Sequence, residues 1–190
     1  MKERIWMVVF VLILGTLWTS VLVAVNALTL PTIEKYELEK VRMSVLGAFS
    51  IPFDRTTLDK VYEENIEVAQ KGDLQFYRNN AGDIAFKIAG NGTQGPISGV
   101  VALESDLTTI KGITIVHQEE TPGLGDRVFE KETLDRFRGK KIKPGILVVP
   151  PGAAKSENEV DGISGATLTC KAFEKILNNQ ANQYLAAAGK

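Results

Sequence analysis

An uncharged apolar run near the N-terminus constrains this chain more than any other feature. Residues 5–25 read IWMVVFVLILGTLWTSVLVAV and contain no Asp, Glu, Lys or Arg. About 20 such residues suffice for a helix to cross the hydrocarbon core of a bilayer. The alternative is a secretory signal cleaved after Val25-Asn26-Ala27, but the apolar part of such signals typically spans only about 7–15 residues. We therefore predict a retained membrane anchor.

The charges beside this run predict its orientation. Lys2 and Arg4 precede the run, and only Glu3 opposes them. Positive residues that flank a span favour the cytoplasmic side of the membrane. The pattern predicts a single-pass protein of the plasma membrane. In a cell that also has an outer membrane, this is the inner membrane. Its N-terminus is then cytoplasmic and its C-terminal domain periplasmic or extracellular.

The composition excludes several classes of function. A formal net charge of −1 argues against a nucleic-acid surface, which needs a clustered basic face. The single His and single Cys do not provide the ligands of a structural zinc site, a CxxCH haem or a cysteine-ligated iron–sulfur cluster. We therefore expect no metal ligands, and any redox chemistry then needs an organic cofactor.

Hydrophobic periodicity beyond the apolar run predicts an α+β fold. Its antiparallel sheet and packed helices follow a single N-terminal transmembrane helix. The predicted helices are 32–48, 56–69, 129–137 and 168–185, and the predicted strands are 74–77, 84–89, 97–103, 110–117 and 146–149. Pro31 is expected to end the membrane helix, and Thr57 to cap the helix at 56–69. Residues 79–82, Asn-Asn-Ala-Gly, have the chemistry of a hairpin turn.

The length of 190 residues allows one moderate domain besides the span. Residues 1–30 are predicted to form the cytoplasmic tail and transmembrane helix, and residues 31–55 a juxtamembrane helix and linker. Residues 56–190 are predicted to form the extracytoplasmic domain. Any functional site is then expected in this last part.

A glycine-rich turn precedes the last predicted helix. Residues 161–169 read DGISGATLT, and the hydroxyls of Ser164, Thr167 and Thr169 lie where the first helical N–H groups lack partners. The N-terminus of a helix after a glycine turn favours a phosphate, through its free N–H groups and its dipole. The alternative is an ordinary helix cap made by Asp161 or Ser164.

A second glycine-rich turn follows the predicted strand at 110–117. Residues 117–125 read HQEETPGLG, in which Pro122 fixes one backbone angle and the two glycines permit tight bends. Such a turn can bring backbone close to a flat ligand. The alternative is a plain connection between a strand and a helix, with Glu119 and Glu120 in solvent.

Together the two turns resemble those of a known family. SGATLT after Asp161-Gly162, with ETPGLG upstream, is similar to the FMN-binding domain of the RnfG/NqrC family. Its members serve the Rnf ferredoxin–NAD oxidoreductase and the sodium-pumping NADH–quinone reductase. The resemblance implies FMN attached by a phosphoester bond to Thr167, installed from FAD by a flavin transferase with magnesium. Cys170 stands where the family usually has a serine.

The resemblance also implies the residues of the cofactor site. These are Thr167 as the attachment point, and around it Ser164, Gly165, Ala166, Leu168, Thr169, Glu120, Thr121, Leu124 and Gly125. Among them, Thr121 and Leu124 would touch the isoalloxazine ring. No side chain is expected to be catalytic, because the flavin does the redox work while the protein sets its position and potential.

The implied function is electron transfer as one subunit of an Rnf-type ion-translocating ferredoxin–NAD oxidoreductase. Such a subunit works only with the other membrane and soluble subunits of its complex. The chain's length favours the Rnf G subunit, because the C subunit of the quinone reductase usually has a longer soluble part. That C subunit is the alternative. Two further alternatives are a membrane-tethered binding or assembly module without flavin and a secreted flavoprotein released by cleavage.

Overall fold

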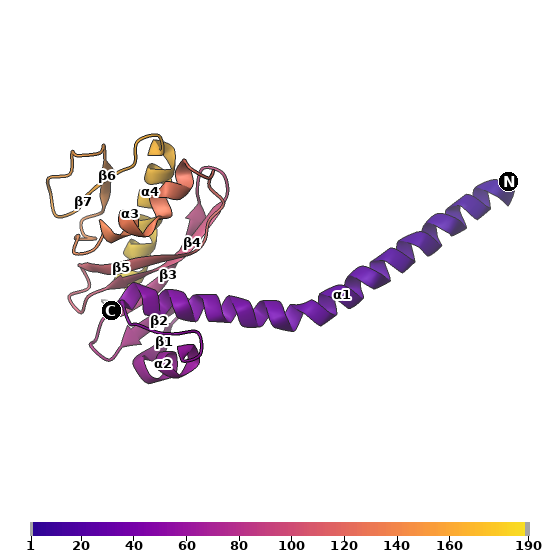
Figure 1. The fold of residues 1–190 in the computed structure, drawn as a ribbon, viewed down its shortest axis with the longest axis horizontal. Coiled ribbons are helices and arrows are strands. Elements are labelled where there is room, and N and C mark those ends of the chain that lie inside the picture. Colours follow the sequence, from indigo (N-terminus) through magenta and orange to yellow (C-terminus); the bar gives the residue numbers. More distant parts are fainter. Residues whose placement is uncertain (1, 189–190) are drawn as a thin grey trace. The chain divides into compact units, whose positions relative to one another are not determined.

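The structure is a computed structural model, and it describes residues 2–188 (Figure 1). It divides into two compact units, Met1–Lys40 and Val41–Lys190, which are described separately. The outer ends of the predicted parts 1–30 and 56–190 therefore lie outside the described residues. The three-part division of the chain remains a prediction.

The first unit is helical throughout its described residues. Its helix, α1 (Lys2–Phe49), continues through Pro31, so the predicted break at this residue is wrong. A proline removes one backbone N–H, and the remaining hydrogen bonds on both sides can keep the chain helical. By length and composition, α1 is the one helix among the described residues that could cross a membrane.

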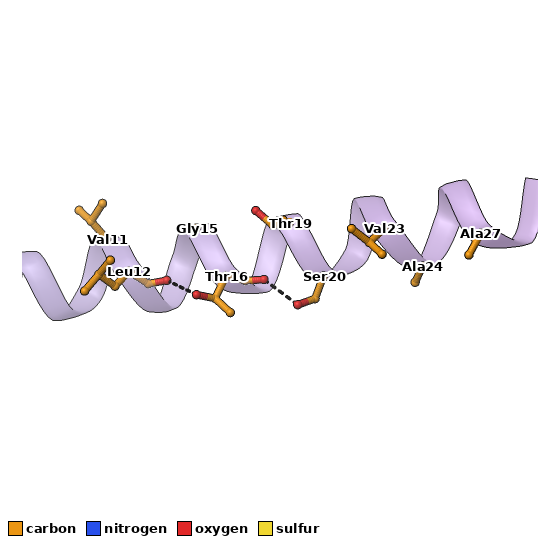
Figure 2. Close-up of a pocket in the computed structure, with 9 residues that line it drawn as sticks. All are labelled: Val11, Leu12, Gly15, Thr16, Thr19, Ser20, Val23, Ala24 and Ala27. Carbon is orange, nitrogen blue, oxygen red and sulfur yellow. Dashed lines mark hydrogen bonds between the residues drawn. The ribbon is translucent and has the colours of Figure 1, made fainter. Parts of the chain in front are cut away.

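The apolar part of α1 carries small and hydroxyl-bearing residues along one side. Figure 2 shows this side, with Gly15, Thr16 and Ser20 among its residues. Thr16 Oγ1 donates to the carbonyl of Leu12 at 2.7 Å, and Ser20 Oγ donates to the carbonyl of Thr16 at 2.8 Å. Such internal hydrogen bonds satisfy hydroxyl groups that hydrocarbon cannot. The polar atoms of these two side chains are therefore compatible with a membrane span.

A five-stranded antiparallel sheet organises the second unit. Its strands pair in sequence order: β1 (Ile66–Lys71), β2 (Leu74–Asn79), β3 (Ile84–Asn91), β4 (Pro96–Leu103) and β5 (Ile110–His117). The predicted antiparallel sheet is confirmed, and four of its strands lie where alternating apolar residues placed them. Between β2 and β3, Gly82 has a φ of 85°, which glycine adopts without strain.

The predicted helix at 56–69 is only partly correct. α2 spans Leu58–Asn65, and the chain then turns into β1. Ile66 is buried and pairs with Asn79 of β2, so pairing with the sheet outweighs the helical spacing of the apolar residues. The hydroxyl of Thr57 makes no cap bond to α2 and instead bonds to the backbone of Asp54.

Apolar residues cover both faces of the sheet. The end of α1 and helix α2 pack on one face, where Leu46, Phe49 and Tyr77 belong to one buried cluster. On the other face lies α4 (Thr167–Ala188), whose Tyr184 stacks on Phe86 with ring centroids 4.5 Å apart. Successive side chains of a strand point to opposite faces, so one sheet supports both cores. Each core contributes roughly 25 cal/mol per Å² of apolar surface removed from water.

Four shorter elements lead to the start of α4. η1 (Gly125–Phe129) and α3 (Lys131–Asp135) replace the predicted helix at 129–137. The predicted strand at 146–149 is confirmed as β6 (Leu147–Val149), which pairs in parallel with the unpredicted β7 (Glu159–Asp161). Directly after β7, Gly162 N donates to the carbonyl of Val149 at 2.8 Å. This short sheet therefore holds the loop from which α4 begins.

Asp83 supplies the first prediction. Its buried carboxylate accepts hydrogen bonds from Lys111 Nζ, from Asn79 Nδ2 at 2.9 Å and from Ser105 N at 3.1 Å. Burial alone would raise the pKa of Asp83, but the bonds from Lys111 and Asn79 hold it below its ordinary value of 3.8. Asp83→Asn removes the charge and should lower the free energy of unfolding by about 2–3 kcal/mol at neutral pH.

The pH dependence of this loss follows from linkage. A depressed pKa stabilises the fold above pH 3.8, and this contribution disappears as pH falls through the lower pKa of the folded state. Urea unfolding of the detergent-solubilised chain measures this effect between pH 7 and pH 3. The difference in the free energy of unfolding between wild type and Asp83→Asn should shrink as the pH approaches 3. Asp73→Asn, on the exposed β1–β2 turn, is the matched control. A gap that is constant with pH would contradict the role given to the charge.

Candidate functional site

Thr167 is the first residue of α4 and is exposed. The preceding turn is closed by a bond from Ala166 N to the carbonyl of Ile163 at 3.1 Å, and Gly165 has a φ of 85°. The first N–H groups of a helix have no partners within it and carry a partial positive charge. The hydroxyl of Thr167 therefore lies at a helix end that favours an anion and is open to solvent.

Two cavities meet at Thr167. The first, here called the Glu120 cavity, has a volume of 290 Å³. It is lined by Thr93, Gln94, Glu120, Thr121, Leu124, Gly125, Gly165, Ala166, Thr167, Leu168 and Thr169. Every predicted site residue except Ser164 lines it, so the structure brings the two glycine-rich turns together at one cavity.

The second, here called the Cys170 cavity, has a volume of 370 Å³ and also includes Gly165 and Thr167 in its wall. Ser164 lines this cavity together with Val149, Pro150, Pro151 and Cys170, a residue that is 4% exposed. The sequence did not indicate this wall, because it depends on the pairing of β6 with β7. Among the predicted site residues, Ser164 therefore lines only the Cys170 cavity, whereas Gly165 and Thr167 line both cavities.

Sequence reasoning also missed Thr93 and Gln94. They lie in the turn between β3 and β4, which is closed by a bond from Gly92 N to the carbonyl of Gly95 at 2.8 Å. The two glycines could have indicated a turn. Only the register of β3 with β4 places that turn beside the residues at 120–125 and 167–169.

Glu120 is buried, with 5% of its surface exposed, so the alternative in which both glutamates lie in solvent is wrong for this residue. Its Oε1 accepts from Thr93 N at 2.6 Å and from Gln94 N at 3.2 Å. Its Oε2 accepts from Thr169 Oγ1 at 2.8 Å. The carboxylate therefore joins three segments that are distant in the sequence. Glu119, in contrast, is exposed and lies 3.0 Å from His117 Nε2.

Two leucines give the Glu120 cavity an apolar rim. Leu168, in the first turn of α4, is 73% exposed. Leu124, in the turn after β5, is 53% exposed. Large exposed apolar side chains at a cavity indicate a surface that a ligand or partner covers. This rim suits a flat aromatic ring, and the start of α4 suits a phosphate, so the residues present fit FMN.

Gly125 supplies the second prediction. A Cβ atom at this position would lie 2.5 Å from Glu120 Oε2 and 2.7 Å from Thr169 Oγ1. Both oxygens are held by hydrogen bonds, so neither can move without breaking one. Gly125→Ala should lower the free energy of unfolding by about 1–3 kcal/mol and reduce FMN occupancy. Gly123→Ala is an informative control, because it has no neighbour within 4 Å but a φ of 75° that strains alanine.

Urea unfolding and the ratio of flavin to protein absorbance measure these two effects. Gly123→Ala should lose stability through backbone strain while leaving the cavity wall in place. Equal flavin occupancy in both variants would show that FMN binding does not require the absence of a Cβ atom at Gly125 beside the Glu120 carboxylate.

Comparison with known proteins identifies the region that contains the site. Residues 92–182 match the family described as FMN-binding domain. The chain is 46% identical over 92 residues to the C subunit of the Na⁺-translocating NADH–quinone reductase of Vibrio vulnificus (strain YJ016), covering 45% of this chain and 36% of the relative. It is 37% identical over 123 residues to the same subunit of Vibrio campbellii, covering 60% and 47%. The chain thus spans less than half the length of these curated relatives.

Two solved structures share the fold. The C subunit of the reductase from Parabacteroides distasonis is 26% identical with a TM-score of 0.72, covering 82% of this chain and 95% of that one. NqrC from Shewanella oneidensis superimposes with a TM-score of 0.69 at 18% identity, covering 77% and 93%. Both cavities meet at Thr167, inside the matched region. Residues 92–182, which match the FMN-binding domain, include every residue that lines the two cavities.

Proposed function

We propose that this chain is a membrane-anchored electron-transfer subunit, of the C-subunit type, in a Na⁺-translocating NADH–quinone reductase, with FMN attached to Thr167. The observation that carries the proposal is the exposed hydroxyl of Thr167 at the start of α4, beside a cavity built from both family motifs. Length alone favoured an Rnf G subunit. The names of the relatives and of the solved structures support the quinone-reductase alternative instead.

The residues around Thr167 support attachment through phosphate. A phosphodiester keeps one negative charge, which the N-terminus of α4 stabilises through its dipole and free N–H groups. Leu124 and Leu168 offer apolar surface to a ring system, and Glu120 and Thr169 add buried polar groups to the lining of the same cavity. Bound FMN supplies one- and two-electron redox chemistry that no side chain of this domain provides.

Formation of the bond requires a second enzyme. The hydroxyl of Thr167 is a weak nucleophile, so a flavin transferase must remove its proton. Thr167 Oγ1 then attacks the FMN phosphorus of FAD, the phosphoanhydride bond breaks, and AMP leaves. The exposure of Thr167 allows a transferase to reach it.

The proposed topology places this chemistry outside the cytoplasm. Lys2 and Arg4 before the apolar run favour a cytoplasmic N-terminus. Residues 1–30 then form the tail and span, 31–55 the connection, and 56–190 the extracytoplasmic domain. A covalent bond would prevent loss of the cofactor on that side of the membrane.

Intact-mass spectrometry of the denatured full chain tests attachment. Co-expression with an active flavin transferase should add the mass of one FMN less one water, and peptide mapping should place it in residues 161–171. Co-expression with an inactive transferase is the control. An unchanged mass beside the active enzyme would refute the covalent carrier and favour a tethered module without flavin.

The choice of complex needs a separate measurement. Deletion of the chain's gene from its host should remove NADH–quinone reductase activity from membranes and leave ferredoxin–NAD reductase activity intact. Restoring the gene should restore the lost activity. Loss of the ferredoxin-dependent activity instead would return the assignment to an Rnf-type complex.

A further inference from the structure

A buried chain of hydrogen bonds runs from Glu120 into the cavity wall. Thr169 Oγ1 lies 2.8 Å from Glu120 Oε2, and Thr93 Oγ1 lies 3.3 Å from Thr169 Oγ1. Thr169 is 4% exposed, whereas Thr93 is exposed at the cavity. All three residues line the Glu120 cavity. They therefore form a relay from a buried carboxylate to a hydroxyl that a ligand can reach.

Counting donors fixes the direction of this relay. A carboxylate only accepts hydrogen bonds, and each threonine hydroxyl has one hydrogen to give. Glu120 Oε1 already accepts two backbone N–H groups, so Oε2 takes the hydrogen of Thr169. Thr169 can then only accept from Thr93, which uses the single hydrogen of Thr93. The oxygen of Thr93 is left with lone pairs alone for the cavity.

The surrounding glycines show that this arrangement is built into the fold. A Cβ at Gly125 would collide with Glu120 Oε2 and Thr169 Oγ1, and a Cβ at Gly92 would collide with Glu120 Oε1. Glycine on both sides of the carboxylate leaves the room it needs. Glu120 N also donates to Gln118 Oε1 at 2.7 Å, which fixes its backbone.

We propose that Glu120 is a positioning residue whose relay through Thr169 and Thr93 makes the Thr93 hydroxyl on this wall of the cavity accept hydrogen bonds and not donate them. The wall then selects a ligand with an N–H or O–H group at that point, a class that includes the imide N–H of an isoalloxazine. This assignment rests on the proposed FMN site, and it gives Glu120, which was expected in that site, a role that acts through Thr169 and Thr93.

Glu120→Gln tests the direction of the relay with little change of shape. The glutamine Oε1 can still accept the two backbone N–H groups, but its Nε2 donates to Thr169. Thr169 then donates to Thr93, and Thr93 donates into the cavity. The variant therefore reverses the wall from acceptor to donor, while also removing one negative charge. Glu119→Gln removes the same charge from the neighbouring exposed residue and is the control.

A double-mutant cycle separates the effect of reversing the hydrogen bonds of the relay from the effect of removing the charge of Glu120. The midpoint potential of bound FMN is measured in the full-length loaded chain as wild type, Glu120→Gln, Thr93→Val and the double variant. Loss of charge alone gives additive shifts. The relay predicts coupling, seen as a change of about threefold or more in the ratio of reduced to oxidised flavin at fixed potential. Additive shifts, or an equal shift in Glu119→Gln, would overturn the proposal.

The apo chain gives a second measurement that does not depend on FMN. Urea unfolding of wild type, Glu120→Gln, Thr169→Val and the double variant should show coupling of about fivefold or more in the unfolding equilibrium constant. Additive effects would show that Thr169 does not donate to Glu120, and would overturn the relay. Absence of FMN from the wild type, with coupling present in the apo chain, would refute the proposed cofactor while the relay stands.

Discussion

Thr167→Ala is expected to abolish covalent attachment of FMN, reducing the flavin retained after denaturation from nearly one per chain to none. Alanine has no hydroxyl, so no oxygen remains at this position to bond to phosphorus. Thr167 is exposed and contributes little to packing, so the free energy of unfolding should change by no more than about 0.5 kcal/mol. Intact mass and in-gel flavin fluorescence of the denatured chain, co-expressed with the transferase, measure the loss.

Two matched variants decide whether the position or the hydroxyl matters. Ser164→Ala removes an exposed hydroxyl from the same turn but leaves Thr167, and it should keep full attachment. Thr167→Ser keeps a hydroxyl at the start of α4 and should retain attachment. The rate of attachment to this variant, compared with wild type, measures the contribution of the threonine methyl group. Full labelling of Thr167→Ala would move the bond to another residue, with Ser164 the first to examine.

The parts of the fold that sequence could predict depend on local chemistry. Alternation of apolar residues placed β2 to β5, and Gly82 indicated the turn between β2 and β3. The sequence was misleading where one local rule met a competing interaction. Pro31 did not end α1, because one lost hydrogen bond does not unwind a helix supported on both sides. Ile66 joined the sheet although its spacing suited α2.

The candidate site also has a part that the local sequence could predict and a part that depends on contacts between distant segments. The two glycine-rich turns were identifiable as segments, and their likeness to one family indicated which residues belong together. The hydrogen bonds of the supporting wall were not predictable, and neither was the presence of Thr93 in it, because Glu120 is 27 residues from Thr93 and 49 from Thr169. Only the register of the sheet and the position of α4 bring these atoms within hydrogen-bond distance. A glutamate beside a second glutamate in a loop gave no sign that one would be buried and the other exposed.

Phe173→Ala is expected to be the most destabilising of the substitutions proposed for this chain. Phe173 is 0% exposed, and its ring packs edge-on against Phe129 at 5.2 Å and Phe137 at 5.7 Å between ring centroids. Removing a buried phenylalanine leaves a cavity and costs about 3–5 kcal/mol. Phe53→Ala, partly buried on the opposite face of the sheet, should cost less and serves as the control. Urea unfolding of the detergent-solubilised chain measures both.

Attachment of FMN to the same variants shows what the transferase recognises. Phe173 lies in the second turn of α4, and its contacts with Phe129 and Phe137 hold the start of that helix beside the Glu120 cavity. If the enzyme reads a folded helix start, labelling of Phe173→Ala should fall with the fraction of folded chain, and Phe53→Ala should label normally. Full labelling of a chain that is largely unfolded would show that the enzyme reads the sequence around Thr167. The helix end and the cavity would then serve the attached flavin and not its attachment.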